Sequence, residues 1–109
     1  MSNQRCIRSA YWIGKPKPGM EERFATLTND TVIPAMRALP GVHDAWAMWP
    51  TSREDDPPAI ACQIIVAFQN REDLARMLAS PGRKEMRPTV VELKSIFDGH
   101  ISHIEYDVV

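Results

Sequence analysis

The sequence holds little of what usually marks a catalytic or metal-binding protein. Its two cysteines, Cys6 and Cys62, form no Cys-x-x-Cys pair, and it has only three histidines. It contains neither a phosphate-binding glycine loop nor a nucleophile-elbow serine. The acidic run at residues 53–56 lacks the patterned ligands of a calcium loop and reads as a solvated turn. We therefore expect no metal site and no bound cofactor.

The cysteines are expected to be small buried hydrophobic residues. Both fall in predicted strands. Cys6 begins the first strand, whereas Cys62 lies near the start of the third, which should be its antiparallel neighbour. The two should then lie well beyond the ~7 Å Cα separation that a disulfide allows. We expect both to be free thiols.

The sequence also has no large excess of positive or negative charge and no long apolar run. The formal net charge is −1, and the Lys and Arg residues look scattered rather than striped, which argues against nucleic-acid binding. No apolar run approaches the ~20 residues that span a bilayer, and no signal-type stretch follows the first five residues. The expectation is a cytoplasmic protein with no nucleic-acid or membrane partner.

What is present is a repeated order of elements within one domain, residues 1–109. Each half reads strand, helix, strand, and the halves meet at an acidic, proline-bearing turn, residues 51–58. The first helix should be kinked or restarted near Pro34, since proline lacks a backbone donor. The second helical region should break at residues 80–82. Strands are expected at residues 6–13, 42–49, 59–68 and 100–109, and helices at residues 20–39, 70–79 and 83–98.

This order predicts an α+β protein with an antiparallel βαββαβ sheet and its helices on one face. Residues 59–68 carry apolar side chains on both faces, whereas a solvated face would carry charges. Ala61, Ile65 and Ala67 occupy the face away from the helices. Something should cover that face, and a second copy of the chain would do so. The sequence therefore predicts a homodimer.

The residues at the turns and at the ends of the predicted helices and strands resemble those of the dimeric alpha-beta barrel superfamily, whose members share a ferredoxin-like fold. The stress-responsive A/B barrel branch is similar at residues 17–19, 39–42, 66–68, 80–81 and 104–108. The EthD-like branch is similar at residues 15–20 and in the spacing of Pro34 from Pro40. The resemblance implies a small-molecule barrel, and the superfamily includes cofactor-independent monooxygenases and dismutase-like enzymes.

The resemblance carries no catalytic residue. EthD-like proteins tend to have a histidine two residues before the helical proline, where this chain has Val32. The stress-responsive branch tends to have histidines near residues 80–81, where this chain has Arg83 and Lys84. Candidates for chemistry must therefore come from the residues themselves.

The histidines are the first candidates. His100 and His103 are three positions apart on a predicted strand and so face opposite sides, which prevents both from binding one metal. Each histidine can be an ordinary surface, interface or core residue. Alternatively, His103 is a catalytic acid or base, or His43 a hydrogen-bond donor, in a pocket.

Strand residues supply the remaining candidates for ligand binding. Tyr11 and Trp46 could line a pocket for a flat or apolar molecule, or simply pack in the core and dimer interface. Arg8 within the first strand needs either a partner, such as Asp44, Glu105 or Asp107, or an anionic ligand.

Two functions remain open from the sequence. One is a homodimeric barrel that binds a small organic compound, with cofactor-independent oxidative or degradative activity. The other is a non-catalytic stress-related or structural binding protein. An enclosed pocket with an inward-facing histidine, Tyr11 or Arg8 would favour an enzyme or a binder. A cavity filled by tryptophans would favour the structural role.

Overall fold

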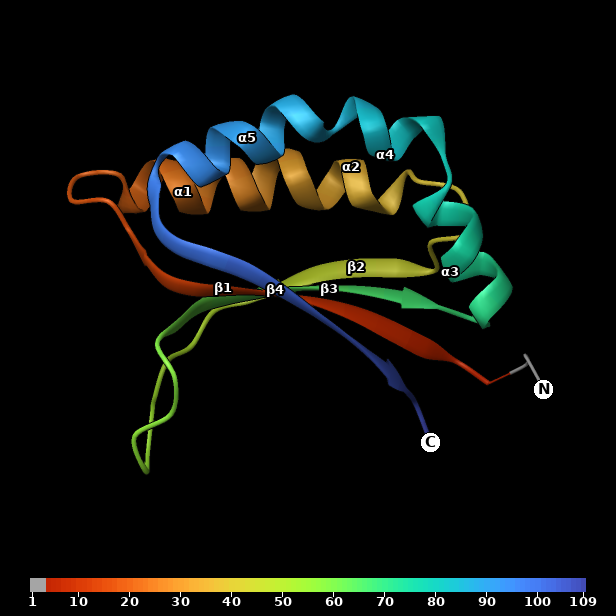
Figure 1. Ribbon diagram of the computed structural model, residues 1–109, viewed down its shortest axis with the longest axis horizontal. Coiled ribbons are helices and arrows are strands. Elements are labelled where there is room, and N and C mark those ends of the chain that lie inside the picture. Colours follow the sequence, from red (N-terminus) through yellow and green to blue (C-terminus); the bar gives the residue numbers. More distant parts are fainter. Residues whose placement is uncertain (1–3) are drawn as a thin grey trace.

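The computed structural model describes residues 4–109 and has two layers, a sheet and a layer of helices (Figure 1). The antiparallel sheet has the order β2-β3-β1-β4. All the helices lie on one side of it, so the predicted α+β fold is confirmed (Figure 1). The strands are β1 (Cys6–Pro16), β2 (Asp44–Met48), β3 (Ile60–Phe68) and β4 (Phe97–Asp107).

The first helical segment is continuous but changes its winding in the middle. It runs through α1 (Glu21–Leu27), a π-helical stretch η1 (Thr28–Val32) and α2 (Ile33–Arg37). The π-helical turn sits directly before Pro34, where the missing backbone donor prevents a regular α-helical hydrogen bond. The predicted irregularity at this proline is therefore present as a π turn.

The second helical region is divided into α3 (Arg71–Leu78), α4 (Pro81–Glu85) and α5 (Arg87–Ser95). The Asn70 side chain caps α3 by accepting a hydrogen bond from the Asp73 backbone at 2.8 Å. Ser80 caps α4 in the same way, so the predicted break at residues 80–82 is confirmed. None of the helices within residues 4–109 has the length and apolarity needed to cross a bilayer.

Strands β1 and β4 are longer than the sequence predicts. The glycines and prolines after residue 13 are expected to end β1, and Phe97 is expected to lie in a helix. Instead, pairing continues to Pro16 opposite Phe97, with Gly14 opposite Gly99. Both glycines have positive φ angles, and a Cβ on Gly99 would lie 1.9 Å from the Ile13 carbonyl oxygen. Glycine here allows the two backbones to approach, which extends the ladder rather than ending it.

The core lies between the sheet and the helices. Trp12 is 2% exposed and makes edge-to-face contacts with Phe24 and Phe97, at centroid distances of 5.2 and 5.1 Å. Cys6 lies opposite Phe68, whereas Cys62 lies opposite Trp12, at the other end of the β1–β3 ladder. Both cysteines are buried and free, as predicted.

The opposite face of the sheet is free of helices. Ser9 and Ile65 are buried there, and Ser9 donates a hydrogen bond to Gln63. The register places Trp46, Ile104 and Tyr106 on the same face. We call this surface the open face of the sheet.

The glycine pair predicts a position-specific loss of stability. Gly99→Ala should lower the free energy of unfolding by about 3 kcal/mol, because the new Cβ would overlap backbone atoms of Ile13. Gly19 also has a positive φ, but a Cβ added there would meet no atom within 4 Å, so Gly19→Ala should cost only about 1 kcal/mol. Urea unfolding of both variants measures the difference. Equal costs would show that the close approach of β1 and β4 is unimportant for stability.

Candidate functional site

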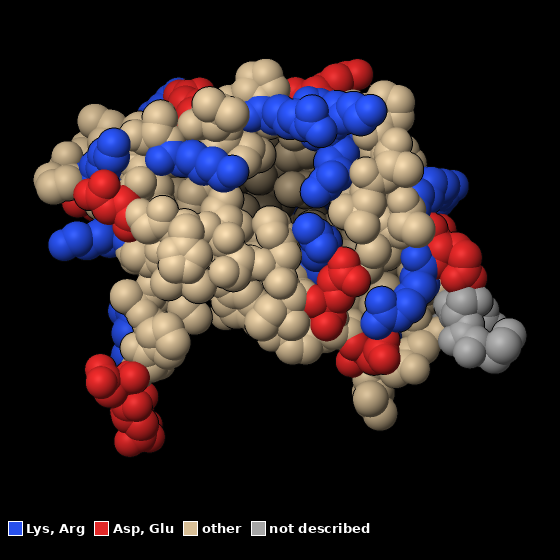
Figure 2. Space-filling model, in the orientation of Figure 1, with Lys and Arg blue, Asp and Glu red and all other residues tan. Residues whose placement is uncertain are grey.

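A cavity of about 360 Å³ lies between the sheet and the helices. Its walls come from β1, β3 and β4 on one side and from η1, α2, α3, α4 and α5 on the other. In Figure 2 it appears as a hollow near the centre of the face, with Lys and Arg side chains around its rim. It opens to solvent there, so a small molecule could enter without unfolding of any element.

The register of the strands determines which side chains form the sheet wall. Ala10 of β1 lies directly opposite Ile64 of β3 and His103 of β4. Arg8 and Trp12 flank Ala10 on the same face, and all five residues line the cavity. The small side chain of Ala10, set between larger neighbours, leaves space at the middle of this wall.

The rim is rich in positive charge. Among the described residues that line the cavity, none is Asp or Glu and five are Lys or Arg. One of these comes from the sheet and four come from the helices opposite. They are Arg8 of β1, Arg83 and Lys84 of α4, and Arg87 and Lys94 of α5.

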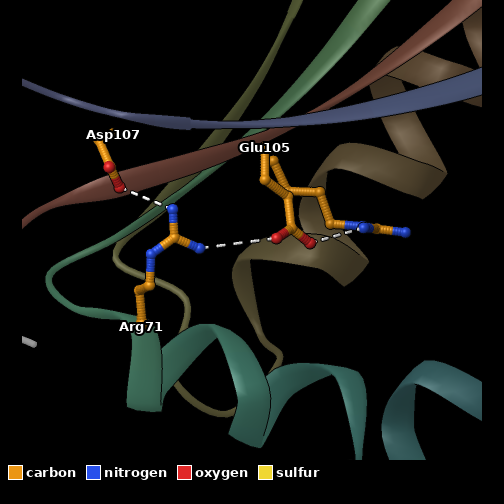
Figure 3. Close-up of polar contacts among 4 residues, drawn as sticks. Arg71, Glu105 and Asp107 are labelled. Atoms are coloured by element: carbon orange, nitrogen blue, oxygen red, sulfur yellow. Dashed lines mark hydrogen bonds and ion pairs between the residues drawn. The ribbon is translucent and has the colours of Figure 1, made fainter.

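Arg8 is held by a chain of ion pairs that runs along the edge of the sheet. Its guanidinium donates to Glu105 at 2.9 Å, directly across the β1–β4 ladder. Arg71, the first residue of α3, reaches the other Glu105 oxygen at 3.7 Å and Asp107 at 2.7 Å (Figure 3). The predicted partner for Arg8 is therefore confirmed as Glu105, and its charge is balanced within this network.

His103 lies at the mouth, on β4 and diagonal to Arg8. Partial burial lowers the pKa of its imidazole below the usual 6.5, and the positive charges of Arg8, Arg83 and Lys94 lower it further. Glu105 opposes this effect only in part. The ring is therefore mostly neutral at pH 7 and able to accept a proton.

The thiols offer no comparable reactivity. Burial raises the pKa of Cys62 to about 12. Burial also raises the pKa of Cys6, although Arg71 works against the shift. Both groups remain protonated near neutral pH and are poor nucleophiles. Among residues 4–109, no cluster of His, Cys, Asp and Glu is arranged to hold a metal ion.

The structure brings two of the five candidate residues to the cavity. Arg8 and His103 line it, whereas Tyr11, Trp46 and His43 do not. Tyr11 follows Ala10 on β1, and alternation along the strand places it on the open face, where its hydroxyl contacts that of Tyr106. Trp46 pairs with Ile65 on that same face, and the exposed His43 precedes β2 and contacts Gln69.

The cations of α4 and α5 are not among the candidates that the sequence suggests. Lys and Arg are expected to be scattered, and this is wrong for residues 83–94. Arg83, Arg87 and Lys94 are separated by four and seven positions, with Val90 between them. This is the spacing of one helix face, and all four residues line the cavity. This spacing can be seen in the sequence. Because the helix breaks between α4 and α5, however, the sequence alone does not show that these side chains share one face.

Comparisons with known proteins identify relatives by structure only. No protein-family model matches the sequence. No curated protein matches it either.

Similar solved structures cover nearly the whole chain. An EthD family protein from Bacillus halodurans C-125 superposes with a TM-score of 0.75 at 11% identity, over 96% of this chain and 99% of that one. A proposed antibiotic biosynthesis monooxygenase from Nitrosomonas europaea gives 0.65 at 16% identity, over 100% and 94%. A variant of SnoaB, a cofactor-independent oxygenase from Streptomyces nogalater, gives 0.56 at 14% identity, over 97% and 93%. The chain therefore has the ferredoxin-like α+β fold of these solved structures, as the sequence predicts.

Proposed function

We propose that this chain binds a small organic compound in the cavity and catalyses a cofactor-independent oxidative or degradative reaction on it. The observation that carries the proposal is the position of His103, a neutral imidazole at the mouth of a mainly apolar cavity. Titratable groups with perturbed pKa values in clefts are candidates for general acid–base catalysis.

The chemistry that the cavity supports begins with a proton transfer. His103 would take a proton from an acidic C–H or O–H group of the bound molecule. The electron pair left behind would lie close to the guanidinium and ammonium groups of the rim, which stabilise negative charge as it forms. An electron-rich anion of this kind can react directly with oxygen or expel a leaving group, and neither route requires a metal.

The comparisons support the proposal at the level of fold. SnoaB is a cofactor-independent oxygenase, and the Nitrosomonas protein is a proposed monooxygenase. One fold hosts many reactions, so the residues of the site carry the proposal. The cavity also fits the other function open from the sequence, a binding protein without catalysis. The two functions differ in whether bound compound is consumed.

Replacing His103 tests the catalytic proposal. The His103→Gln variant keeps hydrogen-bonding capacity but cannot act as a base near pH 7. Oxygen consumption and product formation would be measured with a panel of phenols and enolisable carbonyl compounds. For any compound that the wild type converts, turnover should fall about a hundredfold or more in the variant.

His43→Gln provides the matched control, since His43 is exposed and outside the cavity. Its turnover should equal that of the wild type. Unchanged turnover in His103→Gln would remove this residue from the mechanism. Compounds that bind in the cavity but are never consumed would favour the binding protein.

The pKa of His103 gives a second prediction. Its NMR titration midpoint should lie below 6.5, because burial and the charges of Arg8, Arg83 and Lys94 disfavour protonation. Any reaction that needs the neutral ring should then lose rate only as the pH falls below this midpoint. Arg83→Gln removes one of the three charges and should raise the midpoint toward 6.5. A midpoint at or above 6.5 in the wild type would contradict the assignment of a neutral base.

The open face supports the further proposal that two copies form a homodimer. Ile104 is 47% exposed, and Met48 and Tyr106 are also exposed there. These side chains lie on both edge strands, β2 and β4, and exposed apolar side chains on one sheet face are a surface that a second copy of the chain could cover. A second sheet packed on this face would bury these side chains, together with the partly covered Trp46.

Light scattering at micromolar concentration tests the dimer. Wild-type protein should have twice the mass of one chain. Ile104→Glu should shift it to monomer, because the carboxylate would be buried without a partner. Val91→Glu, an equally drastic change at an exposed residue on α5, should remain dimeric. A monomeric wild type, or dissociation of both variants, would rule out this interface.

A further inference from the structure

We propose that the cavity selects an organic anion, a molecule with an apolar body and one acidic oxygen headgroup such as a carboxylate. The inference rests on the proposed function, because it names the class of compound that the same cavity binds. Two features carry it: the positive charges of the rim without balancing acids, and the apolar depth below them.

Four of the five rim cations, those of α4 and α5, form no ion pair within residues 4–109, whereas Arg8 is paired with Glu105. Within residues 4–109, the Arg residues that form ion pairs are Arg8, Arg23, Arg37, Arg71 and Arg76. The four cations of α4 and α5 form none in that part of the chain. The acidic residues on these helices form no ion pair with them in the described part of the chain, since Glu92 binds Arg23, and neither Glu85 nor Glu92 lines the cavity.

Four like charges on one rim repel one another, and a bound anion would relieve that repulsion. The nearest acidic group on the sheet side, Glu105, is already shared between Arg8 and Arg71. The imidazole of His103 is either neutral or positively charged, so it supplies no negative charge in either state. Among the described residues that line the cavity, no acidic side chain supplies negative charge at the mouth, whereas an anionic ligand would. Guanidinium groups suit such a headgroup, because they can donate two parallel hydrogen bonds to a pair of oxygens.

The interior below the rim is apolar and adaptable. Its wall includes Val32, Met36, Met77, Met86, Val90 and Leu93. Methionine side chains adjust to the shape of a ligand, and about 360 Å³ is enough for a compound of one or two rings.

The methionines also provide a direct readout of where a compound binds. Met36, Met77 and Met86 line the cavity, whereas Met20 and Met48 are exposed and lie outside it. With 13C-labelled methionine methyl groups, a ligand in the cavity should shift the first three signals and leave the other two in place. The probes are naphthalene-2-carboxylate, naphthalene-2-sulfonate and the neutral naphthalene-2-carboxamide.

The expected result is that both anions shift the three cavity methyl groups and bind at least about tenfold more tightly than the carboxamide. In the double variant Arg83→Gln, Arg87→Gln, affinity for the anions should fall about tenfold, as expected for two solvent-accessible charge contacts. Affinity for the carboxamide should not change. The control Arg76→Gln removes an exposed cation that is paired with Asp73 outside the cavity, and it should bind every probe as the wild type does.

The outcomes separate this inference from the function on which it rests. If the carboxamide shifts the cavity methyl groups with the affinity of the anions, the selection of anions is overturned while the cavity remains a binding site. If no probe shifts Met36, Met77 or Met86, the proposed binding function fails as well. Preference for the sulfonate over the carboxylate would keep the class and reassign the headgroup.

Discussion

The register of β1 against β4 is the constraint on which the rest of the structure depends. It places Ala10 opposite His103 and Arg8 opposite Glu105. Because side chains alternate along a strand, these residues face the helices while Tyr11, Ile104 and Tyr106 face the other way. A shift of β4 by one residue would turn Ile104 and Tyr106 toward the helices and His103 and Glu105 toward the open face, which would separate Glu105 from Arg8. The extension of the ladder through Gly14 and Gly99 adds pairs that oppose such a shift.

Charge is distributed over the cavity in two different ways. On the sheet side, Arg8 belongs to a network with Glu105, Arg71 and Asp107, in which two cations meet two carboxylates. That network fixes Arg8 to the sheet and links α3 to the last strand. On the helix side, the four cations of the rim lack such partners among the described residues. Pairing on the sheet side fixes Arg8, whereas the unpaired charge on the helix side would attract an anionic ligand under the proposed function.

Much of the fold follows from the sequence, because turns and caps act locally. The break at residues 80–82 and the cap at Asn70 needed only the physical chemistry of neighbouring residues. The ends of β1 and β4 could not be predicted in this way. Gly14 and Gly99 resemble a turn when each is taken alone, and their role emerges only when the two strands pair.

The site was less predictable, for two reasons. Alternation along a strand predicted that His100 and His103 face opposite sides, but not which side faces the helices. Tyr11 and Trp46 were therefore as plausible as Arg8, and the sheet placed them on the open face. The cations of residues 83–94 come from two helices separated by Met86, so their common face depends on how α4 and α5 pack on the sheet.

The base and the rim are coupled through the same charges. Arg8, Arg83 and Lys94 lower the pKa of His103, and Glu105 raises it. An anion bound among these cations would act in the same direction as Glu105 and make the imidazole more basic. Thermodynamic linkage requires the converse, that a protonated His103 binds the anion more tightly than the neutral ring does. A substrate with an acidic headgroup would therefore strengthen the base that attacks it and then be held more firmly once its proton has moved to the ring. The unpaired cations of the rim would then serve both selection and proton transfer.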